Sequence, residues 1–411
     1  MYGGFTKNTK MLTKSIFSCF ALALMSGTAI AQPKPKPPKK TQSERKVALT
    51  PEEQLATFTV PEGFVVELVA SEKNGIINPI DISFDDAGRL WTQTAEMYPL
   101  DPGGGNVGFR QLLSFAEKSV DELAKKYPEY KRIGDLYKLK TKGTDRVVII
   151  DNPLAEPSGQ ARVFADGLTI PQSILPYKNG VYVAHGSELL YLKDTDGDGK
   201  ADAHETALTG FGFNDSHTMT HCLVRGPGGW IHFSHGALNG GKVVAQSGES
   251  TIVKYSKIGR FSIDGEHVEV VNNGLQNIWG FHLKEDGQWY GTEANDMFQS
   301  LVPMHPYMGY KGLGGSKIRD YQPIVQAVHD FKVSGTGISG LAYDENGSKG
   351  FPEEWKNAGF LANPITSKIN AVVCDRNADG SLVSKHLPDF LESSDDWFRP
   401  VHLEFLSLIH I

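Results

Sequence analysis

The sequence contains few cysteines. Only Cys19, Cys222 and Cys374 occur among its 411 residues. That is too few for a disulfide scaffold in a chain of this length, so Cys222 and Cys374 are expected to be buried or free. A C-x-x-C-H motif for covalent haem attachment is also missing. Basic residues are not in excess, because 41 Lys and Arg stand against 48 Asp and Glu, and the formal net charge is −7. This balance argues against a nucleic acid as partner.

Long apolar runs are missing after the N-terminus, so no transmembrane helix is expected in the mature chain. The one apolar run, SIFSCFALALMSGTAIA, follows Lys14 and ends in the small-x-small triplet Ala29-Ile30-Ala31. This pattern is typical of a signal peptide over residues 1–31, cleaved before Gln32. An uncleaved anchor is the alternative. We expect export, to the periplasm or the cell envelope.

A segment rich in proline and lysine follows the apolar run. QPKPKPPKKTQSERK, which begins at Gln32, has six basic residues, one acidic residue and four prolines. Such a composition favours an extended tether over a packed element. The sequence therefore predicts a linker over residues 32–57, before a folded domain over residues 58–405.

One pattern then recurs: a short β-type run, a turn that holds Gly with Asp or Asn, and a second, aromatic-rich β-type run. The copies are ISFDDAGRLWTQT (82–94), ILPYKNGVYVAHG (174–186), CLVRGPGGWIHFSHG (222–236), FHLKEDGQWYGTE (281–293) and the weaker 340–363. From the second copy onward they recur about every 50–60 residues, a period that suits four-stranded blades.

The pattern predicts an all-β fold, a six-bladed β-propeller. RPVHLEF at residues 399–405 resembles the start of a further copy, but the sequence stops soon after it. We therefore expect the last blade to be truncated, and residues 406–411 to be a non-native end. A helical insertion is expected between the first two copies, where GFRQLLSFAEKSVDELAKKYPEYKR (108–132) has apolar residues at helical spacing and Pro128 ends or kinks the helix.

The segment DTDGDGKADAHE, residues 194–205, matches the calcium-loop template D-x-[DN]-x-[DN]-G-x5-E. The flanking segments have β-type patterns, so the loop is expected to join strands and not the two helices of an EF-hand. A solvated acidic turn that binds no ion is the alternative. The expected calcium ligands are Asp194, Asp196, Asp198, the Lys200 carbonyl, Asp202 and Glu205.

These motifs resemble a known group. FTVPEGFVVELVAS, LTIPQSILPYKNGVYVAHGSELLYLKDTDGDGKADAHETALTGFG, SHTMTHCLVRGPGGWIHFSHG and DDWFRPVHLEF are similar to segments of the membrane-bound dehydrogenases of environmental bacteria. Those are exported propeller domains related to soluble quinoprotein glucose and sorbosone dehydrogenases. The resemblance covers residues 58–405. It implies a sugar or polyol substrate, a cytochrome c-type electron acceptor and two cofactors, calcium and pyrroloquinoline quinone (PQQ).

The resemblance also implies a catalytic base. In the quinoprotein relatives, a histidine removes the proton of the substrate hydroxyl while hydride passes to the quinone. The matching residue is His217, in NDSHTMTHC. His221 is the rival because the spacing to the following Gly-Pro turn differs by one residue, and His235 is a weaker third candidate. For each, a packing or hydrogen-bonding role is the alternative.

Cofactor-binding residues follow from the same matching. Asn277 matches the asparagine of an Arg-Asn pair, whereas Gln276 replaces the arginine. Lys368 matches the cofactor-contacting lysine. Arg399 matches one of two arginines, and Trp397 replaces the other. Gln276 and Trp397 both weaken the case for PQQ, because each removes a cation from the site of an anionic quinone.

A central calcium site would fall on TEAND, with Glu293, Asn295 and Asp296 as candidate ligands, although a solvated turn is equally compatible. Three functions therefore remain open. The first is an exported quinoprotein-like oxidoreductase that acts on a sugar or polyol hydroxyl, with His217 as the base. The others are a calcium-dependent propeller hydrolase of lactonase type and a non-catalytic carbohydrate-binding propeller.

Overall fold

The computed structural model describes residues 47–102, 107, 109–155, 160–236, 238–273, 277–292, 301–304, 338–345 and 351–406. The chain divides into Met1–Glu44 and Arg45–Ile411, and all described residues belong to the second unit. The predicted signal peptide, most of the predicted linker and residues 407–411 lie outside the described part.

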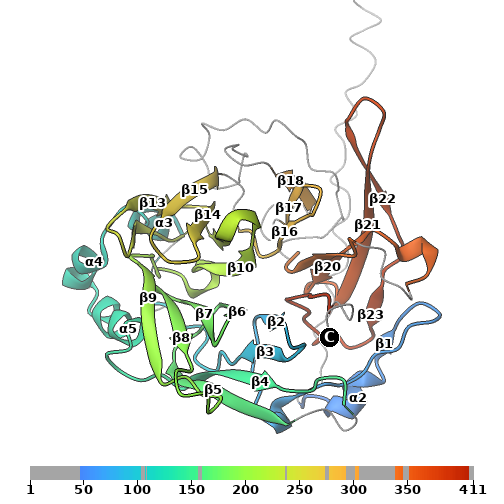
Figure 1. Cartoon of the computed structure of the whole chain (residues 1–411), viewed down its shortest axis with the longest axis horizontal. Helices are drawn as coiled ribbons and strands as arrows, with labels where there is room; N and C mark the ends of the chain where they lie inside the picture. Colours follow the sequence, from blue (N-terminus) through green and yellow to red (C-terminus); the bar gives the residue numbers. More distant parts are fainter. Residues whose placement is uncertain are drawn as a thin grey trace, which may run out of the picture. The chain divides into compact units, whose positions relative to one another are not determined.

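Within the described residues the strands form five sheets, and every strand pair is antiparallel (Figure 1). The first sheet has the order β2 (Ile82–Phe84), β3 (Leu90–Gln93), β4 (Asp145–Ile150), β5 (Ala161–Leu168). The second has the order β6 (Ser173–Tyr177), β7 (Gly180–His185), β8 (Glu188–Lys193), β9 (Ala203–Thr209), β12 (Gly240–Ala245), β13 (Ser250–Lys254).

The remaining three sheets are also antiparallel and also begin with a hairpin. The third has the order β10 (His221–Arg225), β11 (Trp230–His235), β14 (Lys257–Ser262), β15 (Val268–Asn273). The fourth has the order β16 (Phe281–Leu283), β17 (Trp289–Thr292), β18 (Leu301–Met304). The fifth has the order β19 (Leu341–Tyr343), β20 (Ala358–Asn363), β21 (Lys368–Arg376), β23 (Leu391–Ser393), β1 (Phe58–Thr59), and β22 (Leu382–His386) pairs with β21.

The five predicted hairpins are the first two strands of the five sheets, so this part of the prediction is confirmed. The β2–β3 turn shows why the Asp-Gly pattern forms a hairpin. Asp85 Oδ1 accepts hydrogen bonds from the backbone N–H of Ala87, at 2.9 Å, and of Arg89, at 3.0 Å. Gly88 has a φ of 75°, which glycine adopts without the steric cost of a Cβ.

The sheets meet through their first strands. β2 contacts β6, β6 contacts β10, β10 contacts β16, and β16 contacts β19. We use the term entry end for the end of a sheet at which its first strand begins. Hydrogen bonds join the entry ends of neighbouring sheets: Ser173 Oγ donates to Asp81 Oδ2 at 2.5 Å, and Thr292 Oγ1 donates to Ser339 O at 2.6 Å. The entry ends therefore lie together.

Residues 401–403 lie between the fifth and first sheets. The Gly340 N–H donates to Val401 O at 2.9 Å, and His402 Nδ1 is 2.9 Å from Asp81 Oδ1. No regular strand is present here, although RPVHLEF was expected to begin one. The segment nevertheless contacts Gly340, just before β19, and Asp81, just before β2.

Apolar side chains between neighbouring sheets form the core. One cluster includes Tyr182, Leu189 and Phe211 together with Phe233 and Phe261, so it joins the second and third sheets. β7 is buried at every residue, because sheets pack against both of its faces.

The insertion forms three helices, α3 (Phe109–Phe115), α4 (Val120–Lys126) and α5 (Glu129–Tyr137), so the prediction of one helix was wrong. Ser119 Oγ caps α4 by accepting the Glu122 N–H at 3.2 Å, and Pro128 separates α4 from α5. The insertion packs on Phe213 and Met219.

The other helices are short. They are α2 (Pro51–Leu55), η1 (Glu72–Asn74), η2 (Ser216–Thr218), η3 (Pro227–Gly229) and η5 (Glu353–Trp355). α2 lies within the predicted linker, so the end of that segment is ordered. Its start is fixed by a capping box in which Thr50 Oγ1 accepts the Glu53 N–H and Glu53 Oε2 accepts the Thr50 N–H.

Candidate functional site

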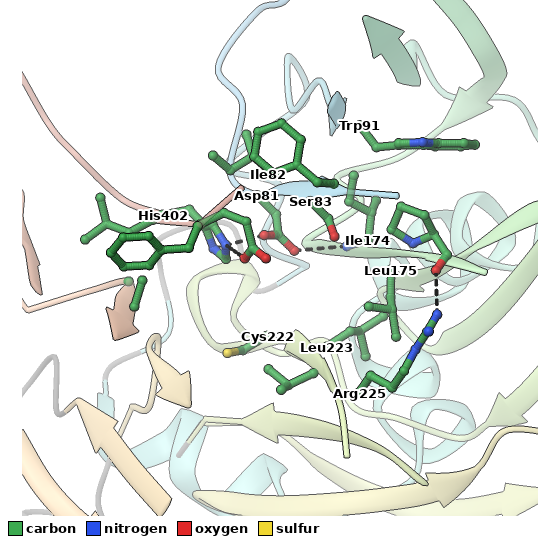
Figure 2. A pocket seen from close by; sticks show the side chains of 18 of the residues that line it. Asp81, Ile82, Ser83, Trp91, Ile174, Leu175, Cys222, Leu223, Arg225 and His402 are labelled. Atoms are coloured by element: carbon green, nitrogen blue, oxygen red, sulfur yellow. Dashed lines mark hydrogen bonds and ion pairs between the residues drawn. The ribbon is translucent and has the colours of Figure 1, made fainter. Parts of the chain in front are cut away.

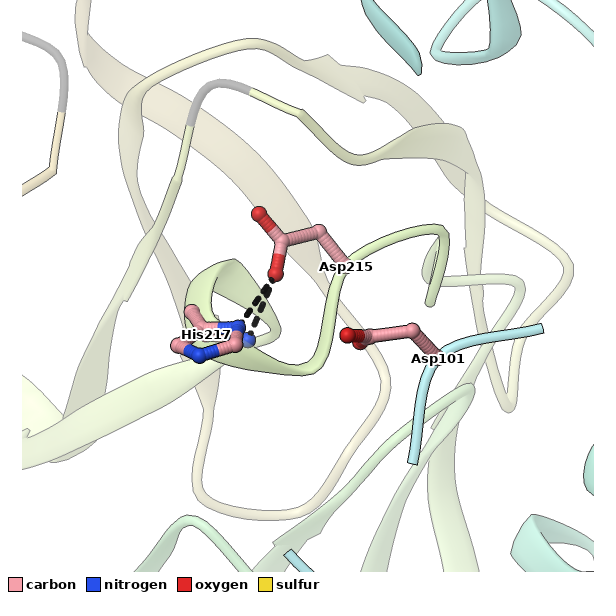
Figure 3. Close-up of side chains that lie close together, drawn as sticks. All are labelled: Asp101, Asp215 and His217. Atoms are coloured by element: carbon pink, nitrogen blue, oxygen red, sulfur yellow. Dashed lines mark hydrogen bonds and ion pairs between the residues drawn. The ribbon is translucent and has the colours of Figure 1, made fainter. Parts of the chain in front are cut away.

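His217 lies in η2, which precedes β10 at the entry end of the third sheet. Its side chain is 53% exposed, and Nδ1 lies 2.8 Å from Asp215 Oδ1 (Figure 3). The same carboxylate oxygen accepts the His217 backbone N–H at 2.9 Å. Because a carboxylate accepts, Nδ1 carries the proton and Nε2 is the ring nitrogen with a lone pair.

Asp215 is held in place from both sides of its backbone. Its N–H donates to Asn239 Oδ1 at 3.0 Å, and its carbonyl accepts from Asn239 Nδ2 at 2.8 Å. Asp101, from the insertion, accepts the Ser216 N–H at 2.7 Å. One ligand-type atom of each of Asp101, Asp215 and His217 lies within 4.8 Å of the other two (Figure 3).

The two carboxylates affect the pKa of the imidazole. The hydrogen bond from Asp215 raises the pKa of His217 above its ordinary value of 6.5. Partial burial opposes this effect, and the negative charges of Asp215 and Asp101 add to it. His217 therefore changes charge at a higher pH than a free histidine.

His221 is in a different environment. Its ring is fully buried, with Nδ1 2.5 Å from Met219 O and Nε2 2.7 Å from Ile278 O, and it stacks on Trp279 at 3.9 Å. Burial lowers the pKa of His221 to about 4. Since both ring nitrogens face backbone carbonyls, His221 joins the starts of two sheets and presents neither nitrogen to solvent.

His235 is also fully buried, and burial lowers its pKa to about 4. Nδ1 lies 3.3 Å from Tyr255 O. Nε2 has no hydrogen-bond partner among the described residues. Of the three histidines predicted for the site, only His217 is open to a ligand from solvent.

The predicted cofactor contacts lie at the same ends of their sheets. Asn277 precedes β16, Arg399 precedes the 401–403 segment, and Lys368 begins β21 after the turn from β20. All three positions are at entry ends, because antiparallel strands return to the same end of a sheet. Asn277 is buried near Gly236, whose N–H donates to Thr218 O at 3.0 Å, so it lies close to the His217 segment.

The two predicted cations already have partners. Lys368 Nζ lies 2.7 Å from Asp389 Oδ2 and 3.0 Å from Glu392 Oε1. Arg399 is exposed and donates to Pro364 O. The structure therefore brings Asn277 near His217 and places Lys368 and Arg399 at the β20–β21 turn.

Several buried polar atoms at the entry end have no hydrogen-bond partner among the described residues. They belong to the ends of second strands or to segments just before first strands, and are Gln93 Oε1 and Nε2, Gln172 Oε1, Ser216 Oγ, Thr220 Oγ1 and His235 Nε2. Buried polar groups usually pair with protein, water or ligand. This end of the sheets can therefore bind a polar ligand.

A cavity of about 540 Å³ lies among the first strands (Figure 2). It is lined by residues of β2, β6, β10, β16 and β19, and by residues 402–405. Burial alone would lower the pKa of His402, which lines it, but attraction to the nearby carboxylates of Asp81 and Glu404 raises it to about 10. None of His217, Asn277, Lys368 and Arg399 lines this cavity.

The predicted calcium loop joins β8 to β9, so the prediction that it lies between strands is confirmed. Asp194 accepts the N–H groups of Gly197, at 2.6 Å, and Gly199, at 2.9 Å. One carboxylate oxygen from each of Asp194, Asp196 and Asp198 lies within 4.8 Å of the other two. The backbone of the loop therefore holds the three carboxylates close together.

The other expected loop ligands have different partners. Glu205 forms an ion pair with Lys193, and Asp202 Oδ1 accepts the Thr195 N–H at 3.0 Å. Lys200 donates its own N–H to Asp198 at 2.8 Å. Of the five expected side-chain ligands, Asp194, Asp196 and Asp198 converge, and the role of the Lys200 carbonyl stays a prediction. Gln276, Glu293, Asn295 and Asp296 lie outside the described residues, and Trp397 is 40% exposed.

Sequence reasoning missed Asp215 and Asp101. Asp215 could have been found, because an Asp two residues before a turn histidine is placed to cap it. Asp101 lies too far along the chain from His217 for any spacing rule to connect them.

Residues 50–405 match the family described as "Domain of unknown function (DUF7133)". The chain belongs to this family. No curated protein matches it. Among the described helices, none is long and apolar enough to cross a membrane.

Several solved structures are similar to the chain. The holo form of the pyranose dehydrogenase PQQ domain from Coprinopsis cinerea is 11% identical, over 84% of this chain and 91% of that one, with a TM-score of 0.47. The PQQ-bound aldose sugar dehydrogenase from Streptomyces coelicolor is 12% identical, over 84% and 87%, with a TM-score of 0.46. The family description assigns no activity, and none of these descriptions mentions a membrane.

Proposed function

We propose that the domain oxidises a hydroxyl group of a sugar or polyol, with His217 as the base. The observation that carries the proposal is the exposed imidazole, held through Nδ1 by Asp215, which leaves Nε2 to accept a proton. Asp215 fixes both the tautomer and the orientation of the ring. In the reaction, the O–H proton moves to Nε2, hydride leaves the same carbon, and the alcohol becomes a carbonyl compound.

The hydride requires an acceptor, and the resemblance implies PQQ with calcium. When bound, such a quinone accepts the hydride that leaves the substrate carbon. The entry end fits a polar, anionic group of this kind. Arg399 is exposed and has guanidinium donors beyond the one that binds Pro364 O. The buried polar atoms of Gln93, Ser216 and Thr220 add hydrogen-bonding capacity.

Asn277 and Arg399 would hold the carbonyl and carboxylate groups of the cofactor. Lys368 would join them only by exchanging Asp389 or Glu392 for a cofactor carboxylate. The protein thus supplies orientation and positive charge, and His217 moves the proton.

We further propose that the fold is a six-bladed propeller in an exported protein. Five sheets and the 401–403 segment follow one another around one cavity, which supports a sixth position. A first strand on its own has unpaired backbone groups along its edge. A complete sixth blade would therefore require further strands from residues beyond those described.

The direct test is dye reduction by the full chain loaded with PQQ and calcium, with D-glucose and sorbitol as substrates. Turnover is expected only with the cofactor present, and His217→Ala should reduce kcat about 100-fold or more. His267→Ala is the matched control, because His267 also pairs with a carboxylate, Glu249, but lies on an exposed turn. Cofactor binding without turnover of any sugar or polyol would contradict the proposal.

A hydrolase is the second candidate, because Asp101, Asp215 and His217 together could hold a divalent metal. Lactone hydrolysis by the calcium-loaded protein without any quinone, abolished by EDTA, would favour this function.

A further inference from the structure

The helical insertion reaches the His217 site through two side chains. The Tyr98 ring lies 5.0 Å from the His217 ring in an edge-to-face arrangement, and Asp101 accepts the Ser216 N–H at 2.7 Å. The segment that carries both is firmly anchored. Asp145, fully buried at the other end of the insertion, accepts the N–H groups of Glu96 at 2.6 Å and Ile170 at 2.8 Å.

The carboxylate of Asp101 has an open oxygen. Oδ1 binds Ser216, whereas Oδ2 has no hydrogen-bond partner among the described residues. In Figure 3 the Asp101 carboxylate and the His217 ring lie on either side of the loop ribbon that continues from Asp215. One carboxylate oxygen of Asp101 lies within 4.8 Å of one ring nitrogen of His217. The site therefore holds both the imidazole that removes a proton and a carboxylate that can accept a second hydrogen bond.

We infer that Asp101 binds the hydroxyl group next to the one that is oxidised, so that the substrate is a vicinal diol. This inference rests on the proposed function of His217. A vicinal diol presents two hydroxyls on adjacent carbons, one for the imidazole and one for the carboxylate. A hydrogen bond to a charged carboxylate is stronger than one between neutral groups.

The same geometry would distinguish a vicinal diol from a substrate that lacks the second hydroxyl. A substrate without the second hydroxyl leaves the Asp101 oxygen desolvated and unpaired, which sites built for a hydroxyl penalise strongly. We expect an affinity difference of about 10- to 100-fold, the equivalent of one charge-assisted hydrogen bond.

Binding can be measured without turnover. Protein labelled with ¹³C-histidine is titrated with 1,2-cyclohexanediol and with 1,4-cyclohexanediol, with and without PQQ and calcium, and the His217 resonance is followed. The wild type should bind the 1,2-isomer about 10- to 100-fold more tightly. Asp101→Asn should remove most of this difference. The amide oxygen of the variant can still accept the Ser216 N–H, so the fold should be retained.

Glu129→Gln is the matched control, because Glu129 is an acidic residue of the same insertion that pairs with Arg132 on the surface. Equal affinity for the two diols, binding of neither, or a full preference in Asp101→Asn would overturn the inference. So would a calcium- or zinc-induced shift of His217 that Asp101→Asn abolishes, because the three side chains would then form a metal site. A vicinal preference without turnover would instead leave Asp101 as a diol-binding residue and remove the proposed oxidation.

Discussion

At the scale of single residues, His217 differs from its buried neighbours in what its ring can do. His185 donates through Nδ1 to Tyr137 O and accepts the Thr169 N–H at Nε2, so both nitrogens are used inside the protein. Burial lowers the pKa of His185 and of His221 to about 4, so both stay neutral near pH 7. His217 alone of these three combines exposure with a carboxylate partner.

The first prediction concerns the pH dependence of turnover. A base must be unprotonated, and the Asp215 hydrogen bond raises the pKa of His217 above 6.5, so kcat/KM should rise with pH through a value above 6.5. The rising part of this pH profile is its acid limb. Asp215→Asn should move the acid limb to lower pH and reduce kcat/KM. Glu249→Gln, which removes a carboxylate from the exposed His267, should leave the limb unchanged. An unmoved limb in Asp215→Asn would show that another group titrates.

The second prediction concerns stability. The pKa of His402 is raised from 6.5 to about 10 in the folded chain, so its pairing with Asp81 stabilises fully below pH 6.5 and is lost as pH rises toward 10. His402→Gln should cost about 3–5 kcal/mol at pH 6 and much less at pH 10. Urea unfolding of wild type and variant at both pH values measures this difference. A pH-independent gap would contradict it.

Part of the site could not be predicted at this scale. NDSHTMTHC contains two histidines, and the sequence left open which one is the base. Burial favours His217, because the His221 ring is enclosed by Met219 O, Ile278 O and Trp279, which lies far along the chain. Such contacts come from tertiary packing, which local spacing does not encode.

At the scale of elements, hairpins and turns were the most predictable parts. The β2–β3 turn has a local cause, the Asp85 side chain that accepts two backbone N–H groups. The insertion was less predictable, since its apolar pattern continues across two breaks. Ser119 and Pro128 mark these breaks, and the insertion packs on Phe213 and Met219, which lie far along the chain.

The third prediction concerns the loop at residues 194–205. It is fastened to the preceding sheet, because the Ala201 N–H donates to Phe164 O at 2.7 Å and Arg162 donates to Gly199 O. Calcium bound by the three aspartates would therefore join two sheets. Calcium at about 100 times its Kd should stabilise the folded chain by about 2.7 kcal/mol, measured as a melting shift reversed by EDTA.

Asp194→Ala with Asp196→Ala should abolish this shift. Asp379→Ala is the control, because Asp379 also accepts a turn N–H, that of Ser381 at 2.9 Å, but belongs to none of the acidic clusters found among the described residues. An unchanged shift in the double variant would show that the loop is an acidic turn and that calcium binds elsewhere.

At the scale of the whole molecule, the first strands and the segment that contains His402 line one cavity. The sequence predicted a further repeat at 399–405 from its likeness to the other copies. It could not show that the segment would lie against both Gly340 and Asp81, since those contacts join the last described residues to the first sheet.

The fourth prediction tests this arrangement. A Cβ at Gly340 would lie 2.7 Å from His402 Cα and 2.9 Å from Val401 O, so Gly340→Ala should displace the segment and cost about 1–3 kcal/mol. A Cβ at Gly134, within α5, would lie at ordinary contact distance, 3.4 Å from the Phe213 ring and 4.0 Å from Val120 Cγ1, so Gly134→Ala should be neutral or stabilising. Chemical denaturation of both variants gives the comparison. Equal stability of the two variants would mean that the segment does not pack there.

The central claim is that His217, oriented by Asp215, removes the hydroxyl proton during oxidation. Its most direct test is the single-turnover rate of cofactor reduction, with PQQ and calcium bound and with sorbitol at saturation. Wild type should reduce the cofactor, and His217→Ala should be about 100-fold slower or worse at unchanged cofactor affinity. Asp215→Asn should fall between them. A His217→Ala variant that binds the cofactor and reduces it at the wild-type rate would contradict the account.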